Sequence, residues 1–437
     1  MISGSHQSIS QFYEGLGSEG ASSSQLKTAV VAFGSQVKFL VDEPVNDTAA
    51  VEKALASFEQ DGSGRESTFA AIKAALDKYK SYQTTKGHQL MFVIVTDEAG
   101  DDAHLVDELT STTKSASIPV YVVGVPAPFG RPAGLRPLDS DKTITQGPES
   151  RYSERIQLAF WGDPYGMELI DSGFGSFHLE RLCDASGGRF VCLRPGATGI
   201  RFQSSFGSSW PSASAGSFES RVMRRYAPDY ISEADYKELL SSNAACKALH
   251  QAAQLGPSGT LNFPPVDFVK RSEAQLVNDL SDAQKIAAKL QPVVNKLYNA
   301  LKSGEADRDK LTSPRWQAGF DLAYGRVLTA KARIDGYNQM LASLKRGKEF
   351  QNESSDRWVL TSVDPKDMTE AGSALKKMAE RARTYLKRVV DEHAGTPWAM
   401  IAEKELNPKV GYSSSFSEVM TKDQFNIGWK WTERGPN

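Results

Sequence analysis

The sequence predicts a doubly wound, mainly parallel α/β sheet followed by an α-helical bundle. Up to about residue 195, short apolar runs of strand length alternate with segments of helical period, which is typical of an α/β domain. From about residue 271, apolar residues recur at steps of three and four over long stretches, which is typical of packed helices. A length of 437 residues leaves room for two or three domains.

Five apolar runs in the first part are predicted to be strands, because they are short and rich in β-branched and aromatic residues. The predicted strands cover residues 27–33, 37–41, 90–96, 120–125 and 188–193. Helical segments precede and separate them, over residues 6–16, 48–58, 69–82, 104–115 and 178–185. One face of the third helical segment is apolar and should pack on the sheet. This face consists of Phe69, Ile72, Ala75, Leu76 and Tyr79.

Two stretches interrupt or follow this alternation. Residues 126–172 are rich in Pro, Gly and Asp around one short hairpin arm, 156–161, and are predicted to be an insertion on the rim of the sheet. Residues 204–217 are rich in serine and are predicted to be a flexible linker. We therefore divide the chain into a sheet domain (1–200), a linker and irregular region (201–270), a helical bundle (271–410) and a C-terminal tail (411–437).

Two long heptad-like patterns lie in the predicted bundle. The first runs from Leu276 to Leu301 and the second from Trp316 to Leu344, with a short glycine-containing link between them. The short link favours an antiparallel, coiled-coil-like hairpin within one chain over a role in oligomerisation. A third helix is predicted over residues 369–393, and a last one over residues 396–406, capped by Thr396.

Composition excludes several classes of function. Lys and Arg total 51 and Asp and Glu total 53, so the net charge of −2 provides no basic field for nucleic acid. No apolar run of about 18 residues could span a bilayer, and no signal peptide follows Met1, so the default expectation is a cytoplasmic protein. No catalytic constellation is evident, and an enzyme is therefore not expected.

The three cysteines, Cys183, Cys192 and Cys246, lack the spacing of a zinc site or a disulfide framework. They are predicted to be buried thiols. A disulfide between the first two is the less favoured alternative.

Three separated segments carry hydroxyl and carboxylate side chains at the ends of predicted strands or at the start of a predicted helix. They are Met1-Ile2-Ser3-Gly4-Ser5, Glu66-Ser67-Thr68-Phe69 and Val95-Thr96-Asp97-Glu98. In order and spacing they resemble the metal-ion-dependent adhesion site (MIDAS) of von Willebrand factor type A (VWA) domains, with its Asp-x-Ser-x-Ser, Thr and Asp. The resemblance covers about residues 1–195 and assigns the role of metal ligand to Ser3, Ser5, Thr68 and Asp97.

This resemblance implies a Rossmann-like fold and a site for Mg²⁺, or for Mn²⁺ or Ca²⁺, because hard cations prefer oxygen ligands. In the family, a carboxylate from a protein ligand completes the coordination of the ion. Met1 stands where the family has its first aspartate, which implies weak or absent metal binding. The family also has a central strand before that position, so the chain resembles a copy truncated at its N-terminus. An upstream extension is therefore expected, and a signal peptide or membrane anchor within it would replace the cytoplasmic default.

Each segment also has a simpler interpretation, in which the serines belong to a disordered terminus, Thr68 is an N-cap and Asp97 is a loop residue. An acidic cluster after the predicted strand at 90–96 either shapes the rim of the metal site or forms the solvated first turn of the next helix. The cluster consists of Asp97, Glu98, Asp101 and Asp102.

The whole sequence predicts a non-enzymatic, metal-assisted protein-binding domain with a helical scaffold. Residues 395–406 add a vaguer resemblance to the end of large bacterial VWA proteins. Two alternatives remain: a structural or scaffolding protein with a non-functional metal site, and a partner subunit of an ATPase.

Overall fold

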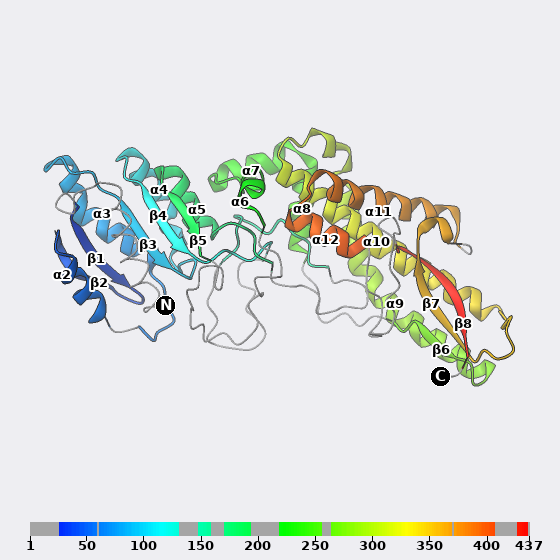
Figure 1. Ribbon diagram of the computed structural model, residues 1–437. Coiled ribbons are helices and arrows are strands. Elements are labelled where there is room, and N and C mark those ends of the chain that lie inside the picture. Colours follow the sequence, from blue (N-terminus) through cyan, green and yellow to red (C-terminus); the bar gives the residue numbers. More distant parts are fainter. Residues whose placement is uncertain are drawn as a thin grey trace. The chain divides into compact units, whose positions relative to one another are not determined.

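The structure is a computed structural model that describes residues 26–58, 61–130, 147–158, 170–193, 218–255, 264–368, 371–406 and 426–435 (Figure 1). The chain divides into two compact units. Unit 1 comprises Met1–Tyr152, Leu169–Ser217 and Pro228–Glu233, and unit 2 comprises Ser153–Glu168, Phe218–Ala227 and Ala234–Asn437. The predicted helix at 6–16, the linker at 204–217 and residues 159–161 of the predicted hairpin arm lie outside the described residues.

The described part of unit 1 contains two small sheets. The strands are β1 (Thr28–Phe33), β2 (Val37–Val45), β3 (Phe92–Thr96), β4 (Val120–Gly124) and β5 (Arg189–Cys192). β3, β4 and β5 form a parallel sheet in that order, which confirms an α/β fold with a parallel sheet. β1 and β2 pair antiparallel, because the three residues between them allow only a tight reversal of the chain. The helices are α2 (Thr48–Ala56), α3 (Thr68–Thr84), η1 (Ala103–Leu105), α4 (Val106–Ser115) and α5 (Phe177–Ser186).

The core of unit 1 lies on one face of the parallel sheet. Ile94 in β3 is paired in register with Val122 in β4, and both side chains are buried. Because side chains alternate along a strand, these two residues lie on the same face, where α3, α4 and α5 contribute the other members of the core. All five residues of the apolar face predicted for residues 69–82 are buried in α3, so this prediction is confirmed.

The prediction that the cysteines are buried thiols is confirmed at two of the three positions. Cys183 and Cys246 are buried, whereas Cys192 at the end of β5 is only half-buried. The prediction is therefore wrong for Cys192, because β5 is the outer strand of the described sheet. Cys183, Cys192 and Cys246 form no disulfide, so the disulfide alternative is also wrong.

Helix α5 carries two titratable side chains whose pKa values are shifted in opposite directions. Burial, reinforced by the charges of Arg151 and Arg181, lowers the pKa of His178 from 6.5 to about 4. Burial raises the pKa of Glu180 from 4.5 to about 7, although the Gly175 N–H donates a 2.9 Å hydrogen bond to its Oε1 atom. The fold therefore favours the neutral form of both side chains.

We predict that these two residues change the pH dependence of unfolding in opposite directions. His178 contributes stability above its unfolded pKa of 6.5 and loses it as the pH falls towards about 4. Glu180 contributes stability below its unfolded pKa of 4.5 and loses it as the pH rises through about 7. In urea unfolding between pH 4 and pH 8, His178→Gln should shrink the acid-side loss by roughly 2 kcal/mol, and Glu180→Gln should shrink the loss towards neutral pH similarly.

The control for this measurement is His104→Gln, since His104 is exposed at the start of the neighbouring helix. Its pH profile should follow that of the wild type. Profiles for His178→Gln and Glu180→Gln that coincide with the wild type would contradict the assignment.

Unit 2 is largely helical in its described residues. Its α-helices from residue 273 onwards are α9 (Glu273–Lys302), α10 (Pro314–Lys345), α11 (Ser373–Glu392) and α12 (Pro397–Leu406). α12 begins as predicted, because Thr396 Oγ1 accepts a 3.3 Å hydrogen bond from the Ala399 N–H. The other elements are α6 (Ser220–Met223), η2 (Arg224–Tyr226), α7 (Glu233–Ser242), α8 (Ala244–Gln254), β6 (Asp267–Val269), η3 (Glu305–Lys310), β7 (Arg357–Val363), η4 (Pro365–Asp367) and β8 (Gly428–Arg434).

Two parts of unit 2 differ from the division drawn from the sequence. Helices α7 and α8 occupy part of the region assigned to a linker and irregular structure, and β8 lies in the predicted tail. β7 is the central strand of a three-stranded antiparallel sheet, with β6 on one edge and β8 on the other. These pairings join segments that are far apart in the sequence, so no local sequence pattern predicts them.

Helix α10 contacts α9, α11, α12 and β8, and it is therefore buried on most of its circumference. At Gly325 a Cβ atom would lie 2.8 Å from Cγ of Leu386, so glycine allows α10 and α11 to approach closely. Helix α9 is buried on one side only. The residues it buries are those of the heptad-like pattern from Leu276 to Leu301.

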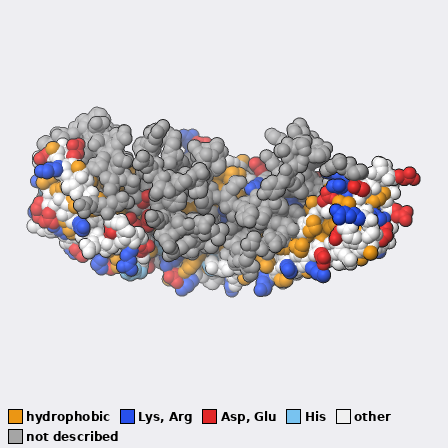
Figure 2. All heavy atoms as spheres, turned by 90° about the horizontal axis from the view of Figure 1, so that it is seen from below, with side chains coloured by type: hydrophobic (Ala, Val, Ile, Leu, Met, Phe, Trp, Pro, Cys, Tyr) orange, Lys and Arg blue, Asp and Glu red, His pale blue; other side chains and the backbone are white. Residues whose placement is uncertain are grey.

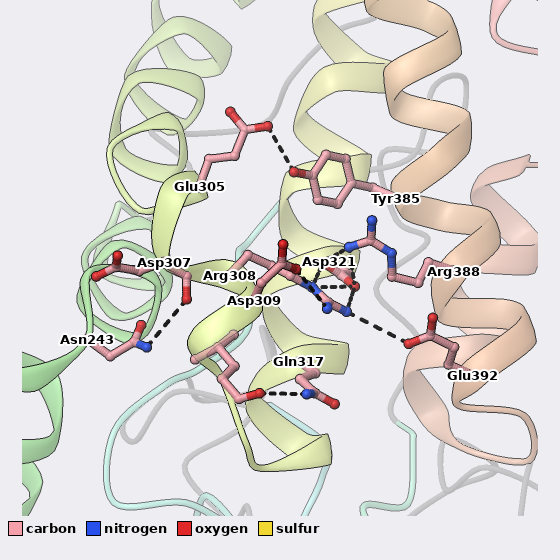
Figure 3. A network of polar contacts seen from close by, with 11 residues as sticks. Asn243, Glu305, Asp307, Arg308, Asp309, Gln317, Asp321, Tyr385, Arg388 and Glu392 are labelled. Atoms are coloured by element: carbon pink, nitrogen blue, oxygen red, sulfur yellow. Dashed lines mark hydrogen bonds and ion pairs between the residues drawn. The ribbon is translucent and has the colours of Figure 1, made fainter.

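The short segment η3 is tied to three helices by its charged side chains (Figure 3). Asp307 accepts a 3.1 Å hydrogen bond from the backbone N–H of Ala244 at the start of α8. The Arg308 guanidinium pairs with Asp321 in α10, with Nε at 2.9 and 3.1 Å from the two carboxylate oxygens. Glu305 accepts a 2.8 Å hydrogen bond from the Tyr385 hydroxyl of α11. These side chains thus connect η3 to α8, α10 and α11.

The described surface in Figure 2 carries acidic and basic side chains interspersed, in keeping with the net charge of −2. Over the ranges that the structure describes, no helix combines the length and apolar character needed to cross a membrane.

Candidate functional site

Two of the four predicted metal ligands lie in the described part of the chain, and Ser3 and Ser5 lie outside it. Thr68 is the first residue of α3, and Asp97 directly follows β3. The Thr68 side chain is 0% exposed, and its Oγ1 atom has no hydrogen-bond partner. Ser67 occupies the N-cap position, so the simpler interpretation of Thr68 as an N-cap is wrong.

Hydrogen bonds hold the loop after β3 against the residues that begin α3. The Asp101 N–H donates to the Glu66 carbonyl over 2.9 Å, and Asp101 Oδ2 accepts the Glu66 N–H over 3.0 Å. Asp102 accepts two further backbone N–H groups from the first turn of α3. The loop that contains Asp97 therefore lies against the helix start that contains Thr68. Of the acidic cluster, Asp101 thus binds the backbone just before α3, and Asp102 binds the backbone of its first turn.

Several carboxylate side chains lie near the contact between the loop after β3 and the start of α3. Burial and the charges of Asp97, Asp101 and Asp61 raise the pKa of Glu66 to about 7. Burial and the charges of Glu66, Asp97 and Asp101 raise the pKa of Glu98 to about 8. Burial also raises the pKa of Asp97. A bound cation would relieve this repulsion and favour the ionised forms.

The described residues provide some of the ligands that a divalent cation would need. Thr68 supplies an unpaired hydroxyl oxygen, and Asp97, Glu66 and Glu98 supply carboxylates, a set of hard oxygen donors that Mg²⁺, Mn²⁺ and Ca²⁺ prefer. Within the described ranges, no three His, Cys, Asp or Glu side chains are grouped so that they could hold a metal ion. A cation here would therefore need hydroxyl oxygens as well as carboxylates, as in the ligand set predicted from the sequence.

Sequence reasoning missed several residues that shape this region. Gly100 has a φ of +83°, and a Cβ atom there would lie 3.1 Å from Thr68 Oγ1. Asp61 accepts hydrogen bonds from the N–H and Oγ of Ser35 over 2.6 and 2.7 Å, and these bonds lower its pKa. At these positions the sequence itself shows only a glycine or an acidic residue in a turn, which does not indicate a role in the site. The partners are distant in sequence, 26 positions away for Asp61, and so could not be read from the turn itself.

The loop with Asp97 and Glu98 lies at the carboxyl end of β3, and in α/β domains with a parallel sheet this is the edge at which ligands commonly bind. In agreement, the model of the von Willebrand factor type A domain family matches residues 5–150 of this chain. The match includes Ser5, Thr68 and Asp97, whereas Ser3 lies just before it.

Two further comparisons add little. A search of curated proteins found no match. A crystal structure described as an uncharacterized membrane spanning protein from Vibrio fischeri is similar to this chain with 14% sequence identity and a TM-score of 0.15, covering 45% of this chain and 78% of that one. That score is too low to support an inference about this chain.

Proposed function

We propose that unit 1 is a non-enzymatic, metal-assisted protein-binding domain. The observation that carries the proposal is the buried Thr68 hydroxyl without a hydrogen-bond partner, beside carboxylates whose pKa values are raised. A buried, unpaired polar group costs about 1–3 kcal/mol, so a ligand that pairs with it is favoured. The family match over residues 5–150 supports the proposal, because VWA domains are known for protein-ligand binding.

In this proposal Thr68 and Asp97, together with Ser3 and Ser5, hold Mg²⁺ or the related Mn²⁺ or Ca²⁺. The bound ion supplies a coordination position for a carboxylate of the partner protein. The bound ion would favour the ionised forms of Glu66 and Glu98, whose pKa values are raised in its absence, and basic residues that flank the partner's carboxylate would then complement them.

Unit 2 is the scaffold in this proposal. Its long helices form a coiled-coil-like bundle that positions the binding domain or docks a second partner. The burial of α10 by α9, α11, α12 and β8 supports a rigid framework.

Calorimetric titration of the whole chain with MgCl₂ and MnCl₂ tests the metal site. We expect Asp97→Ala to abolish the binding heat, because it removes the carboxylate directly after β3. Thr68→Val removes only the hydroxyl and should weaken binding by roughly 10–100-fold. Thr68→Ser keeps the hydroxyl and should retain most of the affinity.

The matched control is Asp77→Ala, since Asp77 lies on the exposed side of α3 with a side chain 65% exposed. Its binding heat should equal that of the wild type. A wild type that gives no heat with either ion would contradict metal-assisted binding and favour the scaffolding alternative. Equal heats for wild type, Asp97→Ala and Thr68→Val would place a metal elsewhere.

A further inference from the structure

The start of α3 lacks a side-chain cap of its own. The first N–H groups of a helix have no partner within the helix, and a Ser or Asp at the N-cap usually accepts one of them. Ser67 stands at the N-cap of α3, but its side chain makes no capping hydrogen bond. The missing acceptor comes instead from a residue more than thirty positions later in the chain.

That acceptor is Asp102. Its Oδ1 atom accepts the Phe69 N–H over 3.1 Å, and its Oδ2 atom accepts the Ala70 N–H over 2.6 Å. A carboxylate at a helix N-terminus is also favoured by the helix dipole. Because both oxygens are directed at the backbone of α3, the two bonds fix the first turn of the helix relative to the loop after β3.

The same loop also limits where the Thr68 side chain can lie. Gly100 has a positive φ of +83°, which favours glycine, and a Cβ atom there would lie 3.1 Å from both Cβ and Oγ1 of Thr68. Thr68 and the adjacent Phe69 are both 0% exposed. The loop thus holds the turn that carries Thr68 by its backbone and confines its side chain.

We propose that Asp102 is a positioning residue, which fixes Thr68 relative to Asp97 without itself being a ligand. This inference rests on the proposed metal site. Asp102 sets the affinity for the ion by holding the Thr68 hydroxyl in place, and it acts through Thr68. Loss of a hydrogen-bonded partner behind a metal ligand typically lowers metal affinity by roughly 10–100-fold.

A double-mutant cycle tests this role, with Mn²⁺ as the probe and the electron paramagnetic resonance signal of free Mn²⁺ as the readout. Asp102→Ala should weaken Mn²⁺ binding by roughly tenfold. Asp102→Asn keeps one acceptor oxygen and should recover part of the affinity. In a Thr68→Val background, Asp102→Ala should cost little more, because the hydroxyl that Asp102 positions is already absent. Asp77→Ala, on the exposed side of α3, serves as the control.

Amide hydrogen exchange without metal gives a second, independent readout. The amides of Phe69 and Ala70 should exchange faster in Asp102→Ala than in the wild type, and at wild-type rates in Thr68→Val. Unchanged exchange at these amides would overturn the capping role.

The outcomes separate the two proposals. A wild type that binds no Mn²⁺ overturns the proposed function, and with it the role of Asp102 at a metal site. A wild type that binds Mn²⁺ with the same affinity as folded Asp102→Ala overturns only the positioning role, as does a full additional loss in the double variant. If Asp102→Ala does not fold, the same comparisons are made with Asp102→Asn.

Discussion

Replacing Glu405 with Gln should destabilise unit 2 by about 3–5 kcal/mol. Glu405 in α12 is buried and is shared by two buried arginines of α10. Its Oε2 atom lies 2.9 Å from Arg326 Nε, and its Oε1 atom lies 2.6 Å from Arg333 Nη1. Glutamine keeps the shape but removes the charge, and its amide hydrogens would face one of the guanidinium groups. Two buried cations would then lack their shared carboxylate.

Urea unfolding followed by tryptophan fluorescence measures this loss. Five of the seven tryptophans are buried in the described part of unit 2: Trp316, Trp358, Trp398, Trp429 and Trp431. Glu403→Gln is the matched control, because Glu403 lies on the same helix but is exposed, and its effect should stay within about 0.5 kcal/mol. A loss below about 1 kcal/mol for Glu405→Gln would show that the two arginines are stabilised without this carboxylate.

The second large effect is expected at Asp321, which lies in the network of Figure 3. Its carboxylate is 0% exposed and accepts hydrogen bonds from Arg308 and, at 3.4 and 3.5 Å, from Nη1 of Arg388. Asp321→Ala should cost about 3–5 kcal/mol, because it leaves the largely buried guanidinium of Arg308 and the partly buried one of Arg388 without their shared partner. The contact between η3, α10 and α11 should loosen as a result.

Asp309 offers an internal comparison, because it pairs with the same arginine at the surface. Its carboxylate lies 3.4 Å from Arg308 Nη1, and its side chain is 92% exposed. Asp309→Ala should therefore change the free energy of unfolding by less than about 1 kcal/mol. Equal losses for Asp309→Ala and Asp321→Ala would contradict the view that burial makes the Asp321 pair decisive.

The positions of two residues of the candidate site could be predicted from residue types and their order, whereas Ser3 and Ser5 lie outside the described residues. Thr68 and Asp97 were identified because hydroxyl and carboxylate residues stand at a helix start and after a buried strand, and the structure places them there. The roles of Glu66, Asp101 and Asp102 could not be predicted. Their effect depends on hydrogen bonds and charges between segments that are 32 to 35 positions apart, as for Asp102 with Ala70 and Asp101 with Glu66.

The sequence by itself determined the positions of those strands and helices that have a clear apolar periodicity, since periodicity is a local property of the chain. It placed β3, β4, α3 and the buried side of α9 correctly. Tertiary structure alone decided which segments pair and which charges are buried. β8 forms a strand because it pairs with β7, and Asp321 and Glu405 are buried because helices close over them. Pairing and burial depend on neighbours brought together by the fold, and the energies of the strongest polar contacts depend on that burial.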